Sequence, residues 1–149
     1  MRAVVQRVLK AVVTAGDERE VSISSGLIAY IGVSRNDTEE DCRYIADKIV
    51  NLRIFEDTTG KMNLSVIDVK GEILLVSQFT LYGDARKGRR PSYDSAADPL
   101  KGEELFNQLR DMIKKRTKEV KTGFFKAHMQ VSCVNDGPVT IILDSSRLF

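Results

Sequence analysis

A short apolar segment at residues 72–79 restricts the possible folds of this chain more than any other feature. It reads Glu-Ile-Leu-Leu-Val-Ser-Gln-Phe, so four apolar residues in a row are followed by two polar ones. A continuous apolar run of this length is typical of a buried strand. Residues 27–33 (Leu-Ile-Ala-Tyr-Ile-Gly-Val) form a second such run. We therefore expect a sheet that contains buried strands.

Further strands are predicted on both sides of these runs. Residues 2–15 are rich in valine, and residues 21–24 alternate apolar and polar side chains. Both patterns favour strands, and a turn at 16–19 would join them as a hairpin. Near the other end, Asn-Asp-Gly at 135–137 is a hairpin signal, and it is followed by an apolar closing strand at 139–143. Most of the sheet is therefore expected to be antiparallel.

Two amphipathic helices are expected between the strands. Thr38 precedes three acidic residues, as at the N-cap of a helix, and an apolar stripe runs through residues 42–52. Residues 98–99 (Asp-Pro) are typical of a helix start, and apolar side chains recur through 105–113. The pattern predicts an α+β fold, with a largely antiparallel, barrel-like or sandwiched sheet and two main helices in a single domain, residues 1–149.

Composition excludes several classes of protein and site. A length of 149 residues with 42% hydrophobic and 30% charged residues fits one globular domain, and no apolar run is long enough to span a membrane. Cys42 and Cys133 are far apart and His128 is the only histidine, so neither a metal site nor a cofactor is expected. We interpret the cysteines as small buried side chains in a cytoplasmic protein, and His128 as an ordinary strand residue.

Positive charge is concentrated in two segments, although the net charge is only +2. Residues 110–121 lie at the end of the second predicted helix, where the helix dipole favours basic side chains without any ligand. Residues 86–90 (Arg-Lys-Gly-Arg-Arg) carry no acidic side chain and lie within a long polar loop at 82–98, and long loops in small domains are often functional. The loop residues expected to contact a polyanion are Arg86, Lys87, Arg89 and Arg90.

Two further segments place polar groups where a pocket can form. The buried strand ends in Ser-Gln-Phe-Thr at 77–80, next to the polar loop. The second segment is Asn-Asp-Gly-Pro-Val-Thr at 135–140, where a proline opens the closing strand and removes a backbone donor. Each alone has a structural explanation, because hydroxyl side chains often satisfy backbone groups and Gly-Pro is common in turns.

Taken together, the two segments closely resemble the paired signatures of the D-aminoacyl-tRNA deacylases. Ser-Gln-Phe-Thr-Leu stands at 77–81, and Asn-Asp-Gly-Pro-Val-Thr stands at 135–140. Further agreement occurs at residues 6–8, 53–55, 60–63, 90–92, 122–123 and 129–131. The resemblance covers essentially the whole chain, and the ordered set of motifs is far more specific than any one of them.

The resemblance implies an enzyme that hydrolyses the ester bond of D-aminoacyl-tRNA, and of glycyl-tRNA mischarged on tRNA-Ala, while rejecting L-amino acids. The family works as a homodimer without a metal, with active sites at the interface. Its Gly-Pro bond is cis, and the carbonyl groups of that motif reach into the partner's pocket to select the hand of the substrate. The basic loop would hold the acceptor end of the tRNA. The catalytic residues implied are Ser77, Gln78, Phe79 and Thr80, and those implied for substrate binding and chiral selection are Gly137, Pro138, Met129, Asn135 and Thr140.

Two mechanisms remain open for the cleavage. Thr80 could act as a nucleophile, but it would need an activating base, and with His128 alone the chain offers no Ser-His-Asp set. Alternatively, the terminal 2′-hydroxyl of the tRNA assists the attack of water, while the protein supplies positioning and backbone N–H groups near Phe79 and Thr80. The missing base favours the second mechanism. Competing functions are a non-catalytic RNA-binding module, an editing domain similar to the N-terminal domain of archaeal threonyl-tRNA synthetases, and a small esterase that uses Thr80.

Overall fold

Eight strands, two helices and one short 3₁₀ turn make up the computed structural model, which describes residues 1–16, 18–117 and 119–148. In chain order the elements are β1 (Arg2–Ala15), β2 (Arg19–Ile23), β3 (Gly26–Gly32), α1 (Glu39–Asn51), β4 (Phe55–Glu56), β5 (Met62–Leu64), β6 (Glu72–Ser77), the 3₁₀ turn η1 (Phe79–Tyr82), α2 (Pro99–Lys114), β7 (Val120–Thr122) and β8 (Gln130–Asp144).

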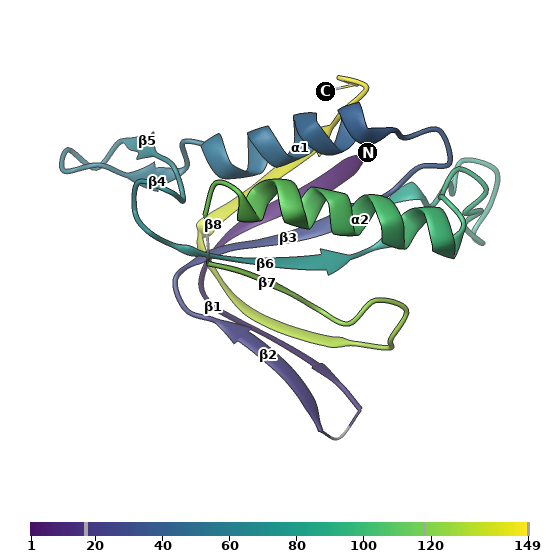
Figure 1. The fold of residues 1–149 in the computed structure, drawn as a ribbon, viewed down its shortest axis with the longest axis horizontal. Coiled ribbons are helices and arrows are strands. Elements are labelled where there is room, and N and C mark those ends of the chain that lie inside the picture. Colours follow the sequence, from purple (N-terminus) through teal and green to yellow (C-terminus); the bar gives the residue numbers. More distant parts are fainter. Residues whose placement is uncertain (17, 118, 149) are drawn as a thin grey trace.

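The main sheet has six strands in the order β2-β1-β3-β6-β7, with β8 paired to β1. Strand β1 is antiparallel to β2, β3 and β8, whereas β6 is parallel to β3 and β7. The two predicted buried strands, β3 and β6, are thus direct neighbours in the parallel part of the sheet. The sheet curls so that the β1–β2 hairpin bends away from the helices (Figure 1). The predicted α+β fold with a mostly antiparallel, barrel-like sheet and two helices is confirmed.

Both helices lie side by side across one face of the sheet (Figure 1). The larger core cluster fills the space between them and the sheet, and it includes Ile45 and Ile49 of α1 and Leu109 and Ile113 of α2. A second, smaller apolar cluster is built from side chains of the strands alone. It includes Leu74 of β6 and residues of β1, β2 and β3. At about 25 cal/mol per Å² of buried apolar surface, clusters of this kind stabilise the fold strongly. The curled end of the sheet therefore has a core of its own.

The helices begin where the sequence predicts. The Thr38 N–H donates to Asp41 Oδ2 over 2.8 Å and completes a capping box at the start of α1. The Asp98 side chain accepts hydrogen bonds from the N–H groups of Leu100 and Lys101 at the start of α2, with Pro99 at the first helical position. Each cap satisfies backbone donors that have no partner inside the helix.

The hairpin expected at residues 135–137 does not exist. Both halves of β8 pair with β1, so that Val8 is opposite Asn135 and Gln6 is opposite Thr140. The residues between Asn135 and Thr140 therefore bulge out opposite Arg7 alone. Asn-Asp-Gly is a local turn signal, and here pairing of both flanking stretches with one 14-residue strand converts the turn into a wide bulge.

The strand predicted at 72–79 ends at Ser77, and Phe79 belongs to η1 because the chain turns there into the loop. The predicted hairpin between β1 and β2 is present, with Ala15 opposite Arg19, although Asp17 of its turn lies outside the described residues. No helix in the described ranges is both long and apolar enough to cross a membrane.

Candidate functional site

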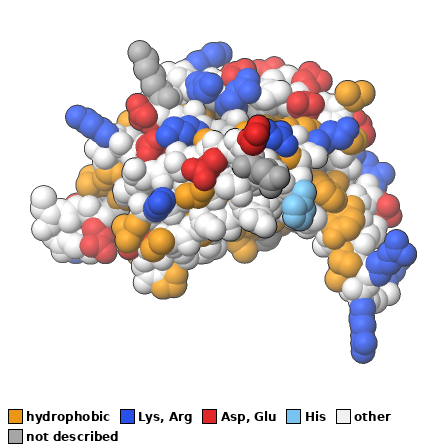
Figure 2. Space-filling view, turned by 90° about the horizontal axis from the view of Figure 1, so that it is seen from below, with side chains coloured by type: hydrophobic (Ala, Val, Ile, Leu, Met, Phe, Trp, Pro, Cys, Tyr) orange, Lys and Arg blue, Asp and Glu red, His pale blue; other side chains and the backbone are white. Residues whose placement is uncertain are grey.

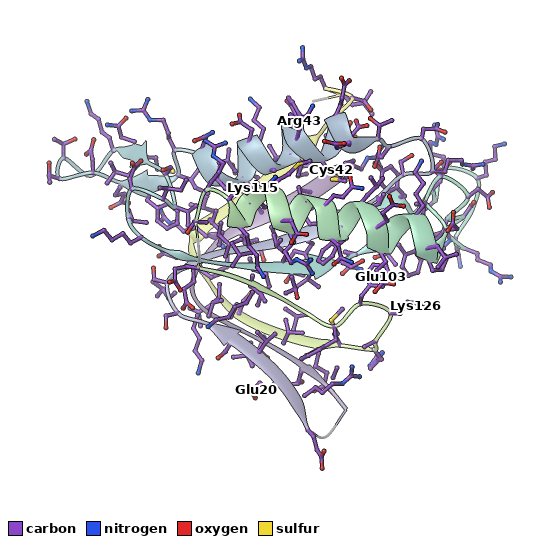
Figure 3. The ribbon with its side chains drawn as sticks, in the orientation of Figure 1. Glu20, Cys42, Arg43, Glu103, Lys115 and Lys126 are labelled. Atoms are coloured by element: carbon purple, nitrogen blue, oxygen red, sulfur yellow. The ribbon has the colours of Figure 1, made fainter. Side chains whose placement is uncertain are left out.

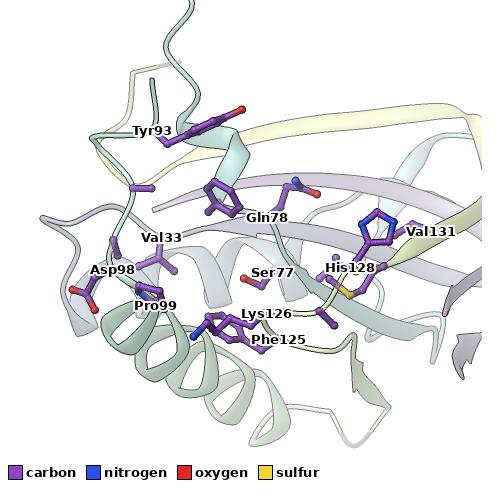
Figure 4. A pocket seen from close by; sticks show the side chains of 17 residues that line it. Val33, Ser77, Gln78, Tyr93, Asp98, Pro99, Phe125, Lys126, His128 and Val131 are labelled. Atoms are coloured by element: carbon purple, nitrogen blue, oxygen red, sulfur yellow. The ribbon is translucent and has the colours of Figure 1, made fainter. Parts of the chain in front are cut away.

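A cavity of about 650 Å³ opens at the carboxyl end of β6. Figure 4 shows that the N-terminus of α2, the end of β6 and the loop between β7 and β8 surround it. Strand ends that meet loops are common positions for ligand sites in sheets. The lining residues are Val33, Val76, Ser77, Gln78, Phe79, Tyr93, Ala96, Ala97, Asp98, Pro99, Gly102, Phe125, Lys126, Ala127, His128, Met129 and Val131.

The end of β6 brings an amide and a hydroxyl to one wall of this cavity. The Gln78 N–H donates to Ile31 O over 2.7 Å, which anchors the chain to β3 as it leaves the sheet. The Gln78 side-chain amide donates to the Thr80 hydroxyl. Ser77 is partly buried, and its side chain lies in the middle of the view in Figure 4. These groups are therefore fixed by the sheet and the following turn.

Aromatic side chains border the same cavity. The Phe79 ring is 56% exposed and meets the Tyr93 ring edge-on, with 5.1 Å between the centroids. Such edge-to-face pairs are favourable arrangements of two rings. Phe125 adds a third ring at the base of the cavity, next to Phe106 of the core. Neither Tyr93 nor Phe125 was predicted as a site residue, because nothing in the local pattern links these positions to the end of β6.

The loop before β8 forms the opposite wall. Met129 Sδ accepts a hydrogen bond from the Phe124 N–H over 3.3 Å, and Met129, which is implied for substrate binding, lines the cavity. His128 lines the cavity too, and Figure 2 shows it at the edge of a group of exposed hydrophobic side chains. The interpretation of His128 as an ordinary strand residue was wrong, since β8 begins only at Gln130.

The bulge in β8 is held by Asn135. Its side-chain amide donates to Arg7 O over 2.9 Å and to Val139 O over 3.0 Å, so that one group ties both ends of the bulge to β1. Thr140 closes the same side, because its hydroxyl donates to Asn135 Oδ1 and accepts from Gln6. Asn135 and Thr140 therefore shape the bulge, which presents Gly137 and Pro138 to solvent.

Gly137 is required by this geometry. Its φ is +113°, a value that side chains disfavour, and a Cβ there would lie 2.8 Å from Val139 Cγ2 and 3.1 Å from Arg7 Nη2. The bond between Gly137 and Pro138 is cis, in agreement with the resemblance. Arg7 itself is buried, and Asp136 Oδ2 lies 2.9 Å from its Nε as an ion pair without an aligned hydrogen bond.

The two predicted parts of the site do not share a cavity within one chain. Ser77, Gln78, Phe79 and Met129 line the cavity. Thr80 is not among the residues that line the cavity, and its hydroxyl accepts a hydrogen bond from the Gln78 amide. The bulge adjoins a separate hollow, which is lined by Arg7 and Asp136 among others. One chain therefore presents a cavity and, elsewhere, an exposed Gly-Pro edge.

The predicted basic loop leaves the rest of the fold and returns to it at one paired base. Asp84 and Ser92 exchange both backbone hydrogen bonds, at 2.7 and 2.9 Å, and hold its base together. The Arg86 guanidinium lies 2.6 Å from Asp84 and holds the pKa of that carboxyl well below its usual range. Lys87, Arg89 and Arg90 are exposed. The loop therefore offers three basic side chains to a ligand, with Arg86 engaged by an acid.

No group of three or more His, Cys, Asp or Glu side chains that could hold a metal ion was found in the described part of the chain. Cys42 is buried, as expected, but Cys133 is exposed on β8.

Comparison with known proteins decides the family. The family model described as D-Tyr-tRNA(Tyr) deacylase matches residues 4–144. This chain belongs to that family. A D-aminoacyl-tRNA deacylase of Thermotoga petrophila is 56% identical over 149 residues, which is 100% of both chains. A D-aminoacyl-tRNA deacylase of Halothermothrix orenii is 54% identical over the same span of 149 residues. The deacylase family resemblance seen in the sequence is thus confirmed over the full length.

Solved structures agree with this assignment of the fold. A protein named c-Myc DNA unwinding element binding protein is 42% identical, covers 97% of this chain with 98% of its own, and superimposes with a TM-score of 0.92. A probable eukaryotic D-amino acid tRNA deacylase is only 16% identical but has a TM-score of 0.82 over 95% of this chain. The latter shows that the fold persists where most of the sequence does not.

Proposed function

We propose that this chain hydrolyses the ester bond of D-aminoacyl-tRNA, releasing a free D-amino acid and tRNA in the cytoplasm. The observation that carries the proposal is the full-length match to the deacylase family, together with the position of residues 77–79 of its signature on the wall of the cavity at the end of β6.

The cavity suits the terminal nucleoside of a tRNA with its amino acid. Single-stranded RNA ends are commonly bound by stacking of bases on aromatic side chains, and Phe79, Tyr93 and Phe125 supply rings along the cavity. The polar groups of Ser77 and Gln78 lie at one wall, where they would meet the ester. The apolar part would then hold the base and the polar part would hold the reacting bond.

The reaction needs little acid–base chemistry from the protein, because an aminoacyl ester is already activated. Ser77 and Gln78 would position the ester, and the N–H groups of Phe79 and Thr80, which have no acceptor within η1 by helix geometry, would stabilise the developing oxyanion. The terminal 2′-hydroxyl of the tRNA would assist the attack of water. The Thr80 hydroxyl is bonded to the Gln78 amide rather than to a base, which favours this route over a Thr80 nucleophile. His128, the single histidine of the chain, lines the cavity and is therefore the one imidazole that could act as a base there.

Gly137 and Pro138 would select the hand of the substrate. Two carbonyl oxygens at the exposed edge of the bulge can accept hydrogen bonds from the substrate α-ammonium group. An L side chain would then collide with the motif, whereas a D side chain would point away from it. Glycine has no side chain to reject, so glycyl-tRNA mischarged on tRNA-Ala would also be cleaved.

A homodimer would bring the two parts of the site together. Within one chain the Gly-Pro edge does not line the cavity, so a second copy must supply it if it selects the substrate. The paired strands β1 and β8 carry exposed apolar side chains, Leu9, Val134 and Ile142, each more than half exposed. An apolar patch of this kind beside the bulge is typical of a surface between copies. Each active site would then combine the cavity of one chain with the bulge of its partner.

The basic loop would hold the tRNA backbone. Arg86, Lys87, Arg89 and Arg90 project from a loop next to Tyr93, which borders the cavity. Contacts to phosphates give affinity without sequence preference, which suits an enzyme that serves many tRNAs.

A second candidate function is nucleic-acid binding without catalysis. The structural relative at 42% identity has a name that describes binding to a DNA unwinding element, and the basic loop would suit a polyanion in either case. The two candidates differ in their products, because only the deacylase releases an amino acid.

The experiment measures free D-tyrosine released from D-tyrosyl-tRNA, with multiple turnovers, using the wild-type chain and the His128→Ala variant. The RNA-assisted mechanism is supported if the wild type and His128→Ala both turn over D-tyrosyl-tRNA, and if both lose this activity when the terminal 2′-hydroxyl of the tRNA is replaced by hydrogen. Tight binding of tRNA without release of D-tyrosine would establish the non-catalytic alternative. If His128→Ala loses turnover by several orders of magnitude while the wild type keeps it, then His128 is the general base and the mechanism does not depend on the tRNA for that step.

A further inference from the structure

A groove distinct from the hollow at Arg7 and Asp136 lies beside the cavity and has a different chemical character from it. It is an open groove of about 520 Å³ between the segment that follows β3 and the start of the basic loop. Arginine, hydroxyl and amide side chains dominate its lining. The lining residues are Arg2, Ser34, Arg35, Asn36, Tyr82, Gly83, Asp84, Ala85, Arg86 and Ser95.

The groove and the cavity are separated by only two backbone segments. Ser34 and Ala96 form an isolated antiparallel bridge. On one side of this bridge Val33 and Ala96 line the cavity, and on the other side Ser34 and Ser95 line the groove. Since consecutive Cα atoms are about 3.8 Å apart, a chain that enters the cavity can cross this bridge and continue into the groove.

Positive charge in the groove is partly fixed in place. The Arg2 guanidinium donates to Asp144 Oδ2 over 2.9 Å and to Leu81 O over 3.1 Å, and it stacks on the Tyr82 ring at 4.7 Å. A guanidinium held in this way binds an anion with little further loss of freedom.

Two further arginines, Arg35 and Arg86, also line the groove. Arg35 is exposed at the rim, where its N–H is bonded to Ser95 O, so its backbone is held by the loop across the groove. Arg86 lies opposite and pairs with Asp84, the one carboxylate among the groove's lining residues. Asp84 pairs with Arg86 and Asp144 pairs with Arg2, so the three guanidinium groups exceed these two carboxylates by one positive charge, which favours an anionic ligand.

We propose that this groove binds the phosphodiester groups of the single-stranded nucleotides that precede the terminal nucleoside in the cavity. Guanidinium groups bind phosphate oxygens through paired hydrogen bonds, and Ser34, Asn36 and Ser95 add neutral donors at the same place. The groove would thereby fix the direction in which the 3′ end of an RNA enters the cavity. The proposal rests on the proposed function for its substrate, although the binding of the phosphates can be measured separately.

The kinetic test compares a substrate that carries these phosphates, within a whole tRNA, with a substrate that lacks them. D-tyrosyl-tRNA carries them, and D-tyrosyl-adenosine does not. In Arg35→Gln the ratio of KM for D-tyrosyl-tRNA to KM for D-tyrosyl-adenosine is expected to rise about tenfold, and the slope of log KM against log salt is expected to fall by about 1. Arg43→Gln removes the same charge from the outer face of α1, where Arg43 pairs with Glu39 (Figure 3), and it should leave the ratio unchanged. An equal ratio in wild type and Arg35→Gln overturns the proposal.

A binding test keeps the outcome independent of catalysis. The trinucleotide CpCpA and inorganic phosphate are each titrated into wild type and Arg35→Gln. An affinity for CpCpA that falls about tenfold in the variant supports the groove as an RNA site. If Arg35→Gln weakens the binding of inorganic phosphate but leaves the binding of CpCpA unchanged, the groove is a site for free anions, and the RNA assignment is overturned. Absence of any D-tyrosine release by the wild type refutes the proposed function instead, and leaves the CpCpA result to decide the groove.

Discussion

The guanidinium of Arg7 lies directly beneath Gly137, so that a Cβ on Gly137 would come within 3.1 Å of Arg7 Nη2. Arg7 is buried in β1, and its Nη1 donates to Ile54 O over 2.6 Å. The same residue accepts the Asn135 amide through its backbone carbonyl. The exposed Gly-Pro edge therefore rests on one rigid side chain, which links the direction of the proposed selector to the core of the fold.

Replacing Gly137 by alanine should damage both stability and selection. The added Cβ meets Val139 at 2.8 Å and the φ of +113° disfavours any side chain, so the free energy of unfolding should fall by about 3 kcal/mol. The ratio of D- to L-tyrosyl-tRNA cleavage should fall as the bulge shifts. Gly60→Ala is the matched control, because Gly60 has a φ of +76° with open space around it, and it should cost only about 1 kcal/mol. Equal losses in both variants in urea titrations would contradict the account.

Arg7→Lys should loosen the bulge without removing the charge. Two different nitrogens of the Arg7 guanidinium meet Ile54 O and Asp136, and a lysine ammonium lacks this planar fork, so about 2 kcal/mol of stability should be lost. The cleavage of D-tyrosyl-tRNA should fall with it. Asp136→Asn removes only the more exposed partner and should cost less. If Asp136→Asn proves the more damaging of the two, then Arg7 does not support the bulge in the way described.

Thr80→Ala should reduce kcat only about tenfold. The Thr80 hydroxyl is bonded to the Gln78 amide and would position that amide rather than attack the ester, and a positioning group costs far less than a nucleophile. Thr80→Ser, which keeps a hydroxyl, separates loss of the oxygen from loss of the methyl group. A fall of several orders of magnitude in Thr80→Ala, recovered in Thr80→Ser, would mean that Thr80 is the nucleophile. Kinetics with D-tyrosyl-tRNA under single-turnover conditions measure the step directly.

Several elements followed from local sequence because local physics determines them. The capping box at Thr38 and the Asp-Pro start of α2 involve residues within one turn of each other. The buried strand ending at Ser77 was likewise visible in four apolar residues in a row. The bulge at Gly137 was misread as a hairpin, because only the pairing of both halves of β8 with one long β1 distinguishes the two.

The walls of the cavity show the same limit. His128 and Tyr93 come from loops whose patterns carry no signal, and the fold brings them to the end of β6. Arg7 lies in a valine-rich strand pattern that gives no sign of its role, and its side chain lies against a bulge 130 positions later in the chain. Long-range packing of this kind cannot be read from spacing along one segment.

Acid should remove a contribution of Glu72 to stability. Hydrogen bonds from Lys121 and from the Ser24 N–H lower the pKa of the Glu72 carboxyl. A lowered pKa in the folded state means that the contribution is present above the unfolded pKa, about 4.3, and is lost as the pH falls through the lower folded value. Glu72→Gln should therefore be less stable than wild type at pH 7, and the difference should vanish in acid.

Urea midpoints from pH 7 to pH 2 measure this difference. Glu20→Gln removes an equal charge from the exposed face of β2 (Figure 3) and serves as the control. A Glu72→Gln midpoint that stays below wild type by the same amount at every pH would mean that the carboxylate charge is not the source of the effect.

The most direct test of the central claim compares the two enantiomers of one substrate. D-tyrosyl-tRNA and L-tyrosyl-tRNA are incubated with the wild-type chain under identical conditions, and kcat/KM for release of tyrosine is measured for each. The account predicts rapid cleavage of the D form and cleavage of the L form slower by at least about a hundredfold, which is the effect of a steric clash of about 3 kcal/mol. Equal rates for the two enantiomers would contradict it, because a site bounded by the Gly137–Pro138 edge could not then be the selector.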